Sequence, residues 1–437
     1  MPDQTADVDL ILTADAVLTV DATGTVVETG AVAIRAGRIV AVGSTDEVLG
    51  RFNATEVLAN PNCVIAPGWV NTHTHLAMNL FRGAVDDVTL EVFLERMIAA
   101  EMRTLSDDTV AVGARAAIAE CLSGGTTTAL DMYWYPRATR RVAAEAGFRL
   151  LNGPTFLGDQ DPDGRDFAGM LDEARSILTD NRAEAPADDL WVMPHSAYTL
   201  SREQLESIRA LAAEFGARIH THASESLGEL ELTVQVNRDR PVAVLDETGL
   251  LRESTVLAHA VHLTDAEIER ISAAGAAVAH CPVSNLKLGC GIARLPDLLQ
   301  HGARVGLGTD GAASAGALDM FAAVRMAALL HKGTSNDPTM ISAERAVRLG
   351  TVDGARALGL TEVGTVEVGM WADLQVVRVD TLHTRPAQDP WSALAYTASA
   401  ADVRHTVVAG RIVLRDRVLQ TIDETSAARA LAEAAAS

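Results

Sequence analysis

The sequence predicts an α/β protein: a (β/α)8 barrel of the TIM type with a small β-sandwich domain built from both chain ends. Three observations lead to this class. Between about residues 66 and 360, apolar strand-like runs alternate with amphipathic helical stretches, eight such runs can be placed, and both chain ends read as short strands with tight turns. The 437 residues suit one barrel of about 250 residues plus a smaller unit. We expect residues 64–363 to form the barrel, and residues 1–63 with 364–437 to form the sandwich.

The chain ends carry turn signals between β-prone runs. Residues 32–35 and 38–43 flank Ala36-Gly37, and residues 405–408 and 411–414 flank Ala409-Gly410 in the same way. Residues 369–379 add a further strand-like run, and the alanine-rich tail after about Asp423 predicts a closing helix. Because the two chain ends show the same pattern, we expect them to form one β unit together.

Polar residues close nearly all of the eight central runs. In a barrel of parallel strands the carboxyl ends gather at one mouth, where the chemistry of such folds lies. Between the runs, residues 202–215 and 265–274 show good helical spacing of apolar positions. The runs end near His73, Asp131, Gly153, His195, His222, His259, His280 and Asp310.

Four of these groups can bind one divalent ion: His73, His75, His222 and Asp310. Residues 64–75 form an apolar run ending in His73 and His75, which leave the same face of an extended segment. Nitrogen donors with one carboxylate suit zinc, and iron(II) also fits. Such an ion lowers the pKa of bound water toward about 7. The run that ends at His195 has no lysine of the kind that bridges two ions in related two-metal barrels, which favours a single metal.

Glu225 and His259 are the expected proton-handling groups. Glu225 follows His222 by three residues, so it can lean over the water without being a ligand. His259 can orient the attacking oxygen. His220 sits two residues deeper than His222, where packing is a better expectation than ligation.

Three other features receive a structural interpretation. His262 is expected to line a loop, and His280 to hydrogen-bond loops in place. The spacing Gly306-Leu-Gly-Thr-Asp-Gly311 matches a dinucleotide fingerprint, but it lies in a closed barrel without the following acidic residue. We interpret its glycines as bringing Asp310 close to the metal.

Composition excludes several classes of protein. The formal net charge of −22 argues against binding nucleic acid or an acidic membrane surface. The first residues show neither a basic start nor a signal-like apolar core, and no apolar run approaches the roughly 18 residues of a spanning helix. We expect a cytoplasmic protein whose four scattered cysteines are buried, reduced thiols.

In combination, these motifs resemble the amidohydrolase superfamily, in its branch of cytosine, guanine and adenosine-derivative deaminases and triazine chlorohydrolases. Within the branch, three segments are most similar to 5′-methylthioadenosine/S-adenosylhomocysteine deaminases: Pro194-His-Ser, Leu257-Ala-His-Ala-Val-His-Leu and Ser284-Asn-Leu-Lys-Leu-Gly. The resemblance covers essentially the whole chain. It implies that His73, His75, His222 and Asp310 hold one metal.

The resemblance also implies residues for the substrate. His195 would meet the purine ring, Glu101 would bind ribose hydroxyls, and Arg165 would grip the amino-acid tail of the larger substrate. The sequence departs from those deaminases at two places, which weakens the inference that it shares their substrate. Asn152-Gly153-Pro154 stands where those deaminases can carry a further arginine, and Ala315-Gly316 stands where they tend to have asparagine.

The leading hypothesis is hydrolytic deamination of an amino-substituted N-heterocycle, an adenosine derivative. Hydroxide attacks the carbon that bears the amino group, Glu225 protonates the adjacent ring nitrogen, Asp310 passes the water proton to ammonia, and His259 stabilises the attacking oxygen. The alternatives are a chlorohydrolase or an aminohydrolase of a triazine, pterin or guanine-like ring, and, from other classes, a non-catalytic ligand-binding barrel or a scaffold. The expected partners are a small heterocycle, water and a second copy of the chain.

Overall fold

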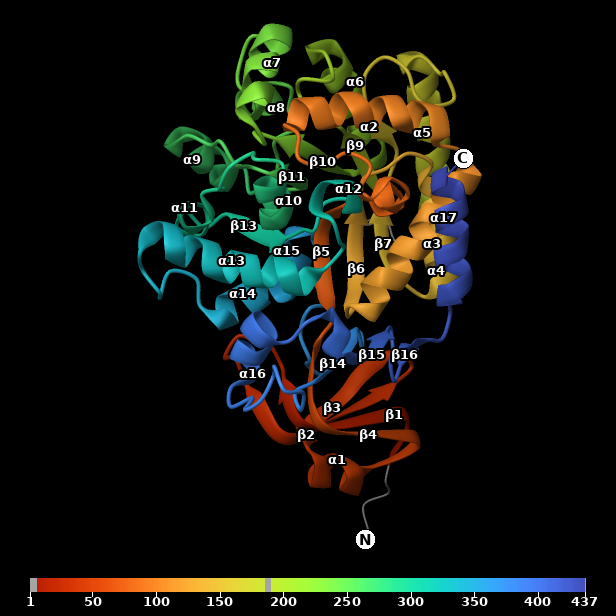
Figure 1. The fold of residues 1–437 in the computed structure, drawn as a ribbon, viewed down its shortest axis with the longest axis vertical. Helices are drawn as coiled ribbons and strands as arrows, with labels where there is room; N and C mark the ends of the chain where they lie inside the picture. Colours follow the sequence, from red (N-terminus) through yellow and green to blue (C-terminus); the bar gives the residue numbers. More distant parts are fainter. Residues whose placement is uncertain (1–5, 185–189, 437) are drawn as a thin grey trace.

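The computed structural model describes residues 6–184 and 190–436. Strands from both chain ends form one sheet of eight strands in the order β17-β16-β15-β14-β4-β1-β2-β3, at the lower end of the molecule in Figure 1. The expectation of a two-layer sandwich is not confirmed, because these strands belong to a single hydrogen-bonded sheet. Their bounds are β1 (Ala6–Leu18), β2 (Val26–Arg35), β3 (Arg38–Ser44), β4 (Phe52–Pro67), β14 (Leu374–Arg378), β15 (Val403–Val408), β16 (Arg411–Arg415) and β17 (Val418–Leu419).

The β2–β3 hairpin forms at the turn that the sequence predicts. Ala36 and Gly37 both have positive φ, at 50° and 78°, as a two-residue type I′ turn requires. Alanine is a less comfortable residue there than glycine. A side chain of the neighbouring strand β1 stabilises the turn, because Asp9 accepts a hydrogen bond from the backbone N–H of Ala36 at 2.6 Å.

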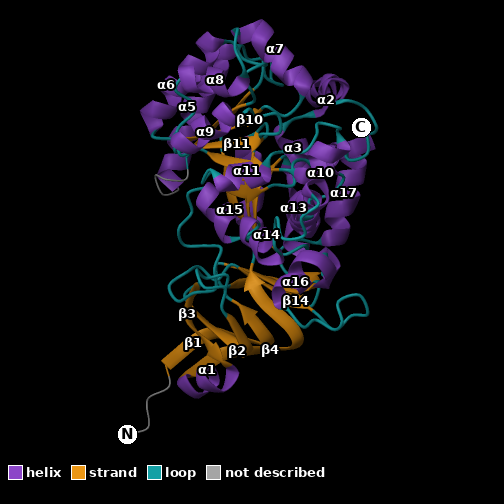
Figure 2. Ribbon diagram, turned by 90° about the vertical axis from the view of Figure 1, so that its left-hand side faces the viewer, coloured by secondary structure: helices purple, strands orange, loops and turns teal. Residues whose placement is uncertain are grey.

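The middle of the chain forms two parallel sheets surrounded by helices (Figure 2). One sheet has the order β5-β6-β7 and the other the order β13-β12-β11-β10-β9-β8. Backbone pairing among the described strands does not join them into one closed ring. They meet where the backbone N–H of Asp310 donates to the carbonyl of His73 at 3.0 Å.

The parallel strands end within a few residues of the predicted positions. This agreement follows from burial: nearly every side chain of these strands is buried, as in a sheet covered on both faces. Their bounds are β5 (Trp69–Thr74), β6 (Thr126–Asp131), β7 (Arg149–Asn152), β8 (Thr155–Phe156), β9 (Trp191–Pro194), β10 (Arg218–Ala223), β11 (Thr255–His259), β12 (Ala277–His280) and β13 (Arg304–Leu307).

Helix α6 (Arg202–Phe215) has the bounds that apolar spacing predicts. Ser201 and Gln204 form a capping box at its start, and Gly216 ends it in the left-handed conformation. The predicted 265–274 helix is α9 (Asp265–Ala273), and the predicted closing helix is α17 (Glu424–Ala436).

The other helices are α1 (Thr45–Arg51), α2 (Leu90–Thr104), α3 (Asp107–Ser123), α4 (Pro136–Ala146), α5 (Phe167–Glu184), α7 (Leu227–Asn237), α8 (Pro241–Glu247), α10 (Pro282–Lys287), α11 (Leu295–Gln300), α12 (Ala312–Ala315), α13 (Met320–Ser335), α14 (Ala343–Leu349), α15 (Val352–Ala357) and α16 (Pro390–Ser392). Within the described part of the chain, no helix combines the length and apolar character needed to cross a bilayer. All four cysteines are free and buried, as predicted.

Candidate metal centre and active site

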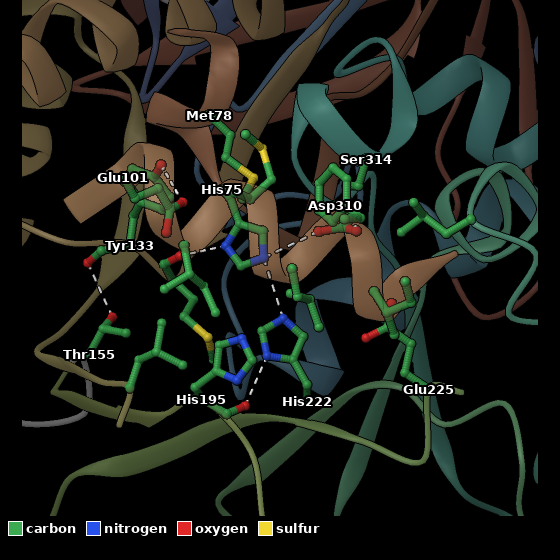
Figure 3. A pocket seen from close by; sticks show the side chains of 18 of the residues that line it. His75, Met78, Glu101, Tyr133, Thr155, His195, His222, Glu225, Asp310 and Ser314 are labelled. Atoms are coloured by element: carbon green, nitrogen blue, oxygen red, sulfur yellow. Dashed lines mark hydrogen bonds and ion pairs between the residues drawn. The ribbon is translucent and has the colours of Figure 1, made fainter. Parts of the chain in front are cut away.

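A cavity of about 650 Å³, including its opening to solvent, lies at the carboxyl ends of the parallel strands. Most of the predicted site residues line it, although they come from distant parts of the sequence (Figure 3). They are His75, Glu101, His195, His222, Glu225, His259 and Asp310. His73 lies directly behind this wall, with its ring centroid 4.7 Å from that of His75.

The predicted ligands His73, His75, His222 and Asp310, here called the four-residue cluster, converge on one point. Candidate ligand atoms of His73, His75 and Asp310 lie within 4.8 Å of one another, and so do those of His73, His222 and His259. Nε2 of His222 is 3.3 Å from Nε2 of His75. The two triads share His73, which stands at the centre of the group.

Hydrogen bonds determine which nitrogen of two of these rings faces the centre. Nδ1 of His75 is 2.5 Å from the carbonyl oxygen of Met132, and Nδ1 of His222 is 2.9 Å from that of His195. Because a carbonyl oxygen only accepts, each Nδ1 carries the hydrogen, and Nε2 is left to face the other cluster members. In Figure 3 these two Nε2 atoms point toward each other, and that of His75 also faces Asp310.

His73 provides a direct test of whether these residues fit a metal ion. Its Nε2 is buried and has no hydrogen-bond partner, although buried polar atoms almost always have one. Burial lowers the pKa of this imidazole to about 3, so the ring is neutral and Nε2 carries a lone pair. Three imidazole nitrogens and one carboxylate are a donor set that suits zinc, so the residues fit.

Asp310 is held by groups outside the cluster. Both Ser284 and Ser314 donate their hydroxyls to Oδ2 at 2.6 Å, while Oδ1 faces Nε2 of His75 at 3.2 Å. Burial opposes ionisation, but the adjacent imidazoles of His73 and His75 hold the pKa of Asp310 well below its usual range. The carboxylate is therefore charged and oriented.

The glycines around Asp310 allow the close approach that the sequence suggests. A Cβ on Gly308 would lie 2.9 Å from the carbonyl oxygen of His73, and one on Gly311 would lie 2.6 Å from Sδ of Met78. Asp310 itself has φ of 63°, and His259 has φ of 71°. Strained backbone at two adjacent site residues is typical of functional sites.

Glu225 is a buried carboxyl beside the cluster. Burial, reinforced by the charge of Asp310, raises its pKa to about 8, so the group is protonated near neutral pH. Its Oε1 is 3.7 Å from Nε2 of His259, whose Nδ1 is 2.8 Å from Oδ1 of Asn285. A carboxyl with such a pKa can donate and recover a proton at neutral pH.

The loop that carries Glu225 is fastened by a second buried acid. Glu229 accepts the backbone N–H of Ser224 at 3.0 Å and that of Glu225 as well. It also sits in the first turn of α7, behind the N-cap Ser226. This arrangement holds the Glu225 side chain on the cavity side of the loop.

The rest of the cavity is apolar with a few polar groups. Helix α2 contributes Leu90, Phe93, Leu94, Met97 and Ile98. Among the described residues that line the cavity there is no lysine or arginine. The cavity therefore suits a flat, largely uncharged molecule.

Two predicted substrate contacts, Glu101 and His195, line this cavity, and whether they bind substrate stays a prediction. Burial raises the pKa of Glu101 to about 7, and its Oε1 accepts the hydroxyl of Tyr133 at 2.7 Å. The His195 ring lies 4.6 Å from that of His222, measured between centroids. Figure 3 shows Glu101 and His195 on separate sides of the cavity.

Besides His73, which lies behind the cavity wall, Arg165 is the predicted site residue that does not line this cavity. It lines a neighbouring cavity, which shares Trp134 and Thr155 with the first. Its guanidinium is ion-paired with Asp161 at 3.0 Å and Asp163 at 2.6 Å.

Three histidines outside the site can also be compared with expectation. His262 lies in a loop as predicted, and its Nε2–H donates to the carbonyl oxygen of Cys290 at 2.6 Å. His280 does not hydrogen-bond loops, because both its ring nitrogens are buried without a partner. His220 belongs to neither triad; it is buried against His73 instead.

Sequence reasoning missed the residues that support the site. Ser284 and Asn285 lie in the segment that carries the resemblance, and Ser314 lies four positions after Asp310. Their spacing to Asp310 and His259 carries no periodic signal. Only the meeting of separate strand ends shows what they contact.

Comparison with known proteins agrees with this geometry. The model of the amidohydrolase family matches residues 64–413, and a short match to an imidazolonepropionase-like composite domain of bacteria covers residues 30–52. The chain therefore belongs to the amidohydrolase family. It is an enzyme of the hydrolase class.

Among its relatives are 5-methylthioadenosine/S-adenosylhomocysteine deaminases. That of Syntrophobacter fumaroxidans is 39% identical over 90% of each chain, and that of Haloarcula marismortui is 38% identical over 92% of each. A solved adenosine deaminase from Xanthomonas campestris with bound zinc is 33% identical, covers 98% of both chains and has a TM-score of 0.95. A triazine hydrolase from Arthrobacter aurescens, 24% identical with a TM-score of 0.90, shares the fold.

Proposed function

We propose that this enzyme is a metal-dependent deaminase that hydrolyses the exocyclic amino group of an adenosine derivative. The observation that carries the proposal is the convergence of the four-residue cluster on one point beside Glu225, a protonated carboxyl. Relatives named as deaminases of 5-methylthioadenosine and S-adenosylhomocysteine, at up to 39% identity, support the substrate class.

In this proposal His73, His75, His222 and Asp310 hold one zinc ion. The Nε2 atoms of the imidazoles and Oδ1 of the carboxylate are the donors, and the bound zinc of the Xanthomonas relative supports the choice of metal. The ion supplies a water that is activated at neutral pH. Asp310 keeps its second oxygen for the hydroxyls of Ser284 and Ser314, so its orientation does not depend on the ion.

The protein side chains handle the protons. Glu225 donates a proton to the ring nitrogen next to the reacting carbon, which makes that carbon a better electrophile. Asp310 takes the proton from the attacking water and returns it to the departing amine. The new carbon–oxygen bond replaces the carbon–nitrogen bond and ammonia leaves, while Glu225 recovers its proton from the hydroxyl that becomes the oxo group of the product. His259 stabilises the developing charge on the attacking oxygen.

The wall residues bind the substrate. His195 meets the purine ring, Glu101 accepts ribose hydroxyls, and the α2 side chains cover the apolar remainder. Arg165 lines the neighbouring cavity, which shares Trp134 and Thr155 with the cavity that holds the purine ring. We therefore assign Arg165 to the tail alone.

We further propose that residues 64–363 form one catalytic unit in which the two parallel sheets make a TIM-type barrel. The three imidazoles come from both sheets, since His73 lies on β5, His75 directly follows it and His222 lies on β10. Residues 1–63 and 364–437 make the second unit, apart from the end of β4, which runs on to Pro67.

The test is ammonia release by the zinc-loaded protein from a panel of compounds: methylthioadenosine, S-adenosylhomocysteine, adenosine, guanine, cytosine and an aminotriazine. Release from the adenosine compounds is the expected result. Chloride release from a chlorotriazine, without ammonia from any adenosine compound, would overturn the proposal in favour of the chlorohydrolase alternative.

A further inference from the structure

His220 contacts the ligand candidate at the centre of the cluster. It lies on β10, two residues before His222, and its side chain is fully buried. Its Nε2 is 2.7 Å from Nδ1 of His73, and its Nδ1 is 3.0 Å from the carbonyl oxygen of Val256 on β11. Both of its ring nitrogens are thus occupied, which leaves neither for a metal ion.

These two contacts determine where the hydrogens lie. The carbonyl of Val256 only accepts, so Nδ1 of His220 carries a hydrogen. Nε2 of a neutral His220 then has a lone pair and accepts the hydrogen on Nδ1 of His73. The opposite arrangement would need a charged imidazolium in a fully buried position, which costs free energy without an anion to pair with.

The same rule holds for the other two imidazoles. His75 and His222 each donate Nδ1–H directly to a main-chain carbonyl, that of Met132 and that of His195. Nδ1–H of His73 instead donates to Nε2 of His220, and Nδ1–H of His220 donates to the carbonyl of Val256. All three rings consequently present Nε2 to the cluster.

We propose that His220 is a positioning residue that holds His73 in the Nδ1–H tautomer and thereby keeps the lone pair of its Nε2 aimed at the metal. The inference rests on the proposed metal site. Partners of this kind fix the orientation of a ligand imidazole and raise its basicity, and their loss typically weakens metal affinity by about 10- to 100-fold.

Two amide variants separate this role from packing. In H220Q the amide oxygen reaches the position of the lost Nε2 and can still accept from His73. In H220N the amide lies one methylene closer to the backbone, so it can meet Val256 but not His73. The two variants differ little in polarity and volume, and H280N is the matched control because His280 is buried at the end of β12 and its ring nitrogens have no hydrogen-bond partner among the described residues.

The experiment is a zinc titration of the metal-free full-length protein against a chromophoric chelator, with thermal unfolding of each variant measured in parallel. We expect H220N to weaken zinc binding about 10- to 100-fold, and H220Q and H280N to stay within about threefold of the wild type. Equal loss in H220N and H220Q, or wild-type affinity in H220N, would overturn the proposal.

This readout is independent of catalysis. A wild-type protein that binds zinc tightly but releases no ammonia would refute the proposed activity and leave the role of His220 to be decided by the titration. A wild-type protein that does not bind zinc would refute both.

Discussion

Nε2 of His75 lies 3.2 Å from Oδ1 of Asp310, a contact between the end of the first parallel strand and the loop after the last. Burial alone would lower the pKa of His75, but the Asp310 carboxylate outweighs it and raises the pKa to about 9. In the absence of metal, the site therefore holds a proton where the cation would bind. Metal binding must displace that proton.

This relationship predicts how stability depends on pH. An unfolded histidine loses its proton near pH 6.5, whereas His75 keeps it to about pH 9. The folded state thus binds more protons than the unfolded state in this window, so stability falls as pH rises through it. The raised pKa values of Glu101, about 7, and Glu225, about 8, act in the same direction.

We therefore expect the Tm of the metal-free protein to fall between about pH 6.5 and 9, and the increase in Tm caused by zinc to grow over the same range. Scanning calorimetry in a series of buffers measures both. D310N, which removes the charge that sustains the His75 proton, should flatten the dependence. A zinc increment that shrinks with rising pH contradicts this assignment.

Replacing Glu225 tests proton transfer. E225Q keeps the shape of the side chain but removes its acid, so we expect zinc to remain bound while kcat falls by about 10²- to 10⁴-fold. Steady-state ammonia release with metal analysis checks both parts. The control is E231Q, an exposed position on α7, the helix that follows Glu225, and it should be indistinguishable from the wild type. Full turnover by E225Q would remove Glu225 from the mechanism.

Replacing Arg165 tests the tail subsite. Its place in the neighbouring cavity predicts that R165A leaves methylthioadenosine deamination unchanged and lowers kcat/KM for S-adenosylhomocysteine by about tenfold, equivalent to roughly 1.4 kcal/mol. The ratio of the two kcat/KM values is the measurement. R137A alters the other arginine of the same cavity and should leave the ratio alone. Equal losses on both substrates would mean that Arg165 acts through the fold.

The serines on Asp310 offer a test of support for the metal site. S314A removes one of two hydroxyls that donate to Oδ2. We expect zinc affinity to fall by about tenfold, at the lower end of the range for groups that orient a ligand. The control is S207A, because the hydroxyl of Ser207 lies on α6 and hydrogen-bonds within that helix. This variant should bind zinc as the wild type does. Unchanged zinc affinity in S314A would show that Ser284 alone is sufficient.

The sequence predicts the strand ends well because burial and turn chemistry are local. Alternating apolar runs place β5, β10 and β11 to within a few residues, and polar residues at their ends identify His75, His222 and His259. Parallel strands deliver such ends to one mouth, so the cluster follows from the fold class.

The spacing of residues in the sequence does not predict contacts between the ends of separate strands. His220 was expected to be a packing residue, and its contact with His73 depends on strands from two different sheets meeting in the interior. Likewise, the strand-like runs at both chain ends suggest a sandwich, but such runs do not determine how strands pair, and they form one sheet.

The central claim is hydrolysis at the carbon that bears the amino group, and one measurement tests it most directly. Zinc-loaded protein is incubated with methylthioadenosine in water labelled with heavy oxygen, and the ammonia and the ring product are both quantified. We expect equal amounts of ammonia and of a 6-oxo product that carries one labelled oxygen. Zinc-loaded protein that releases no ammonia, or a product whose 6-oxo oxygen is unlabelled, would contradict the account.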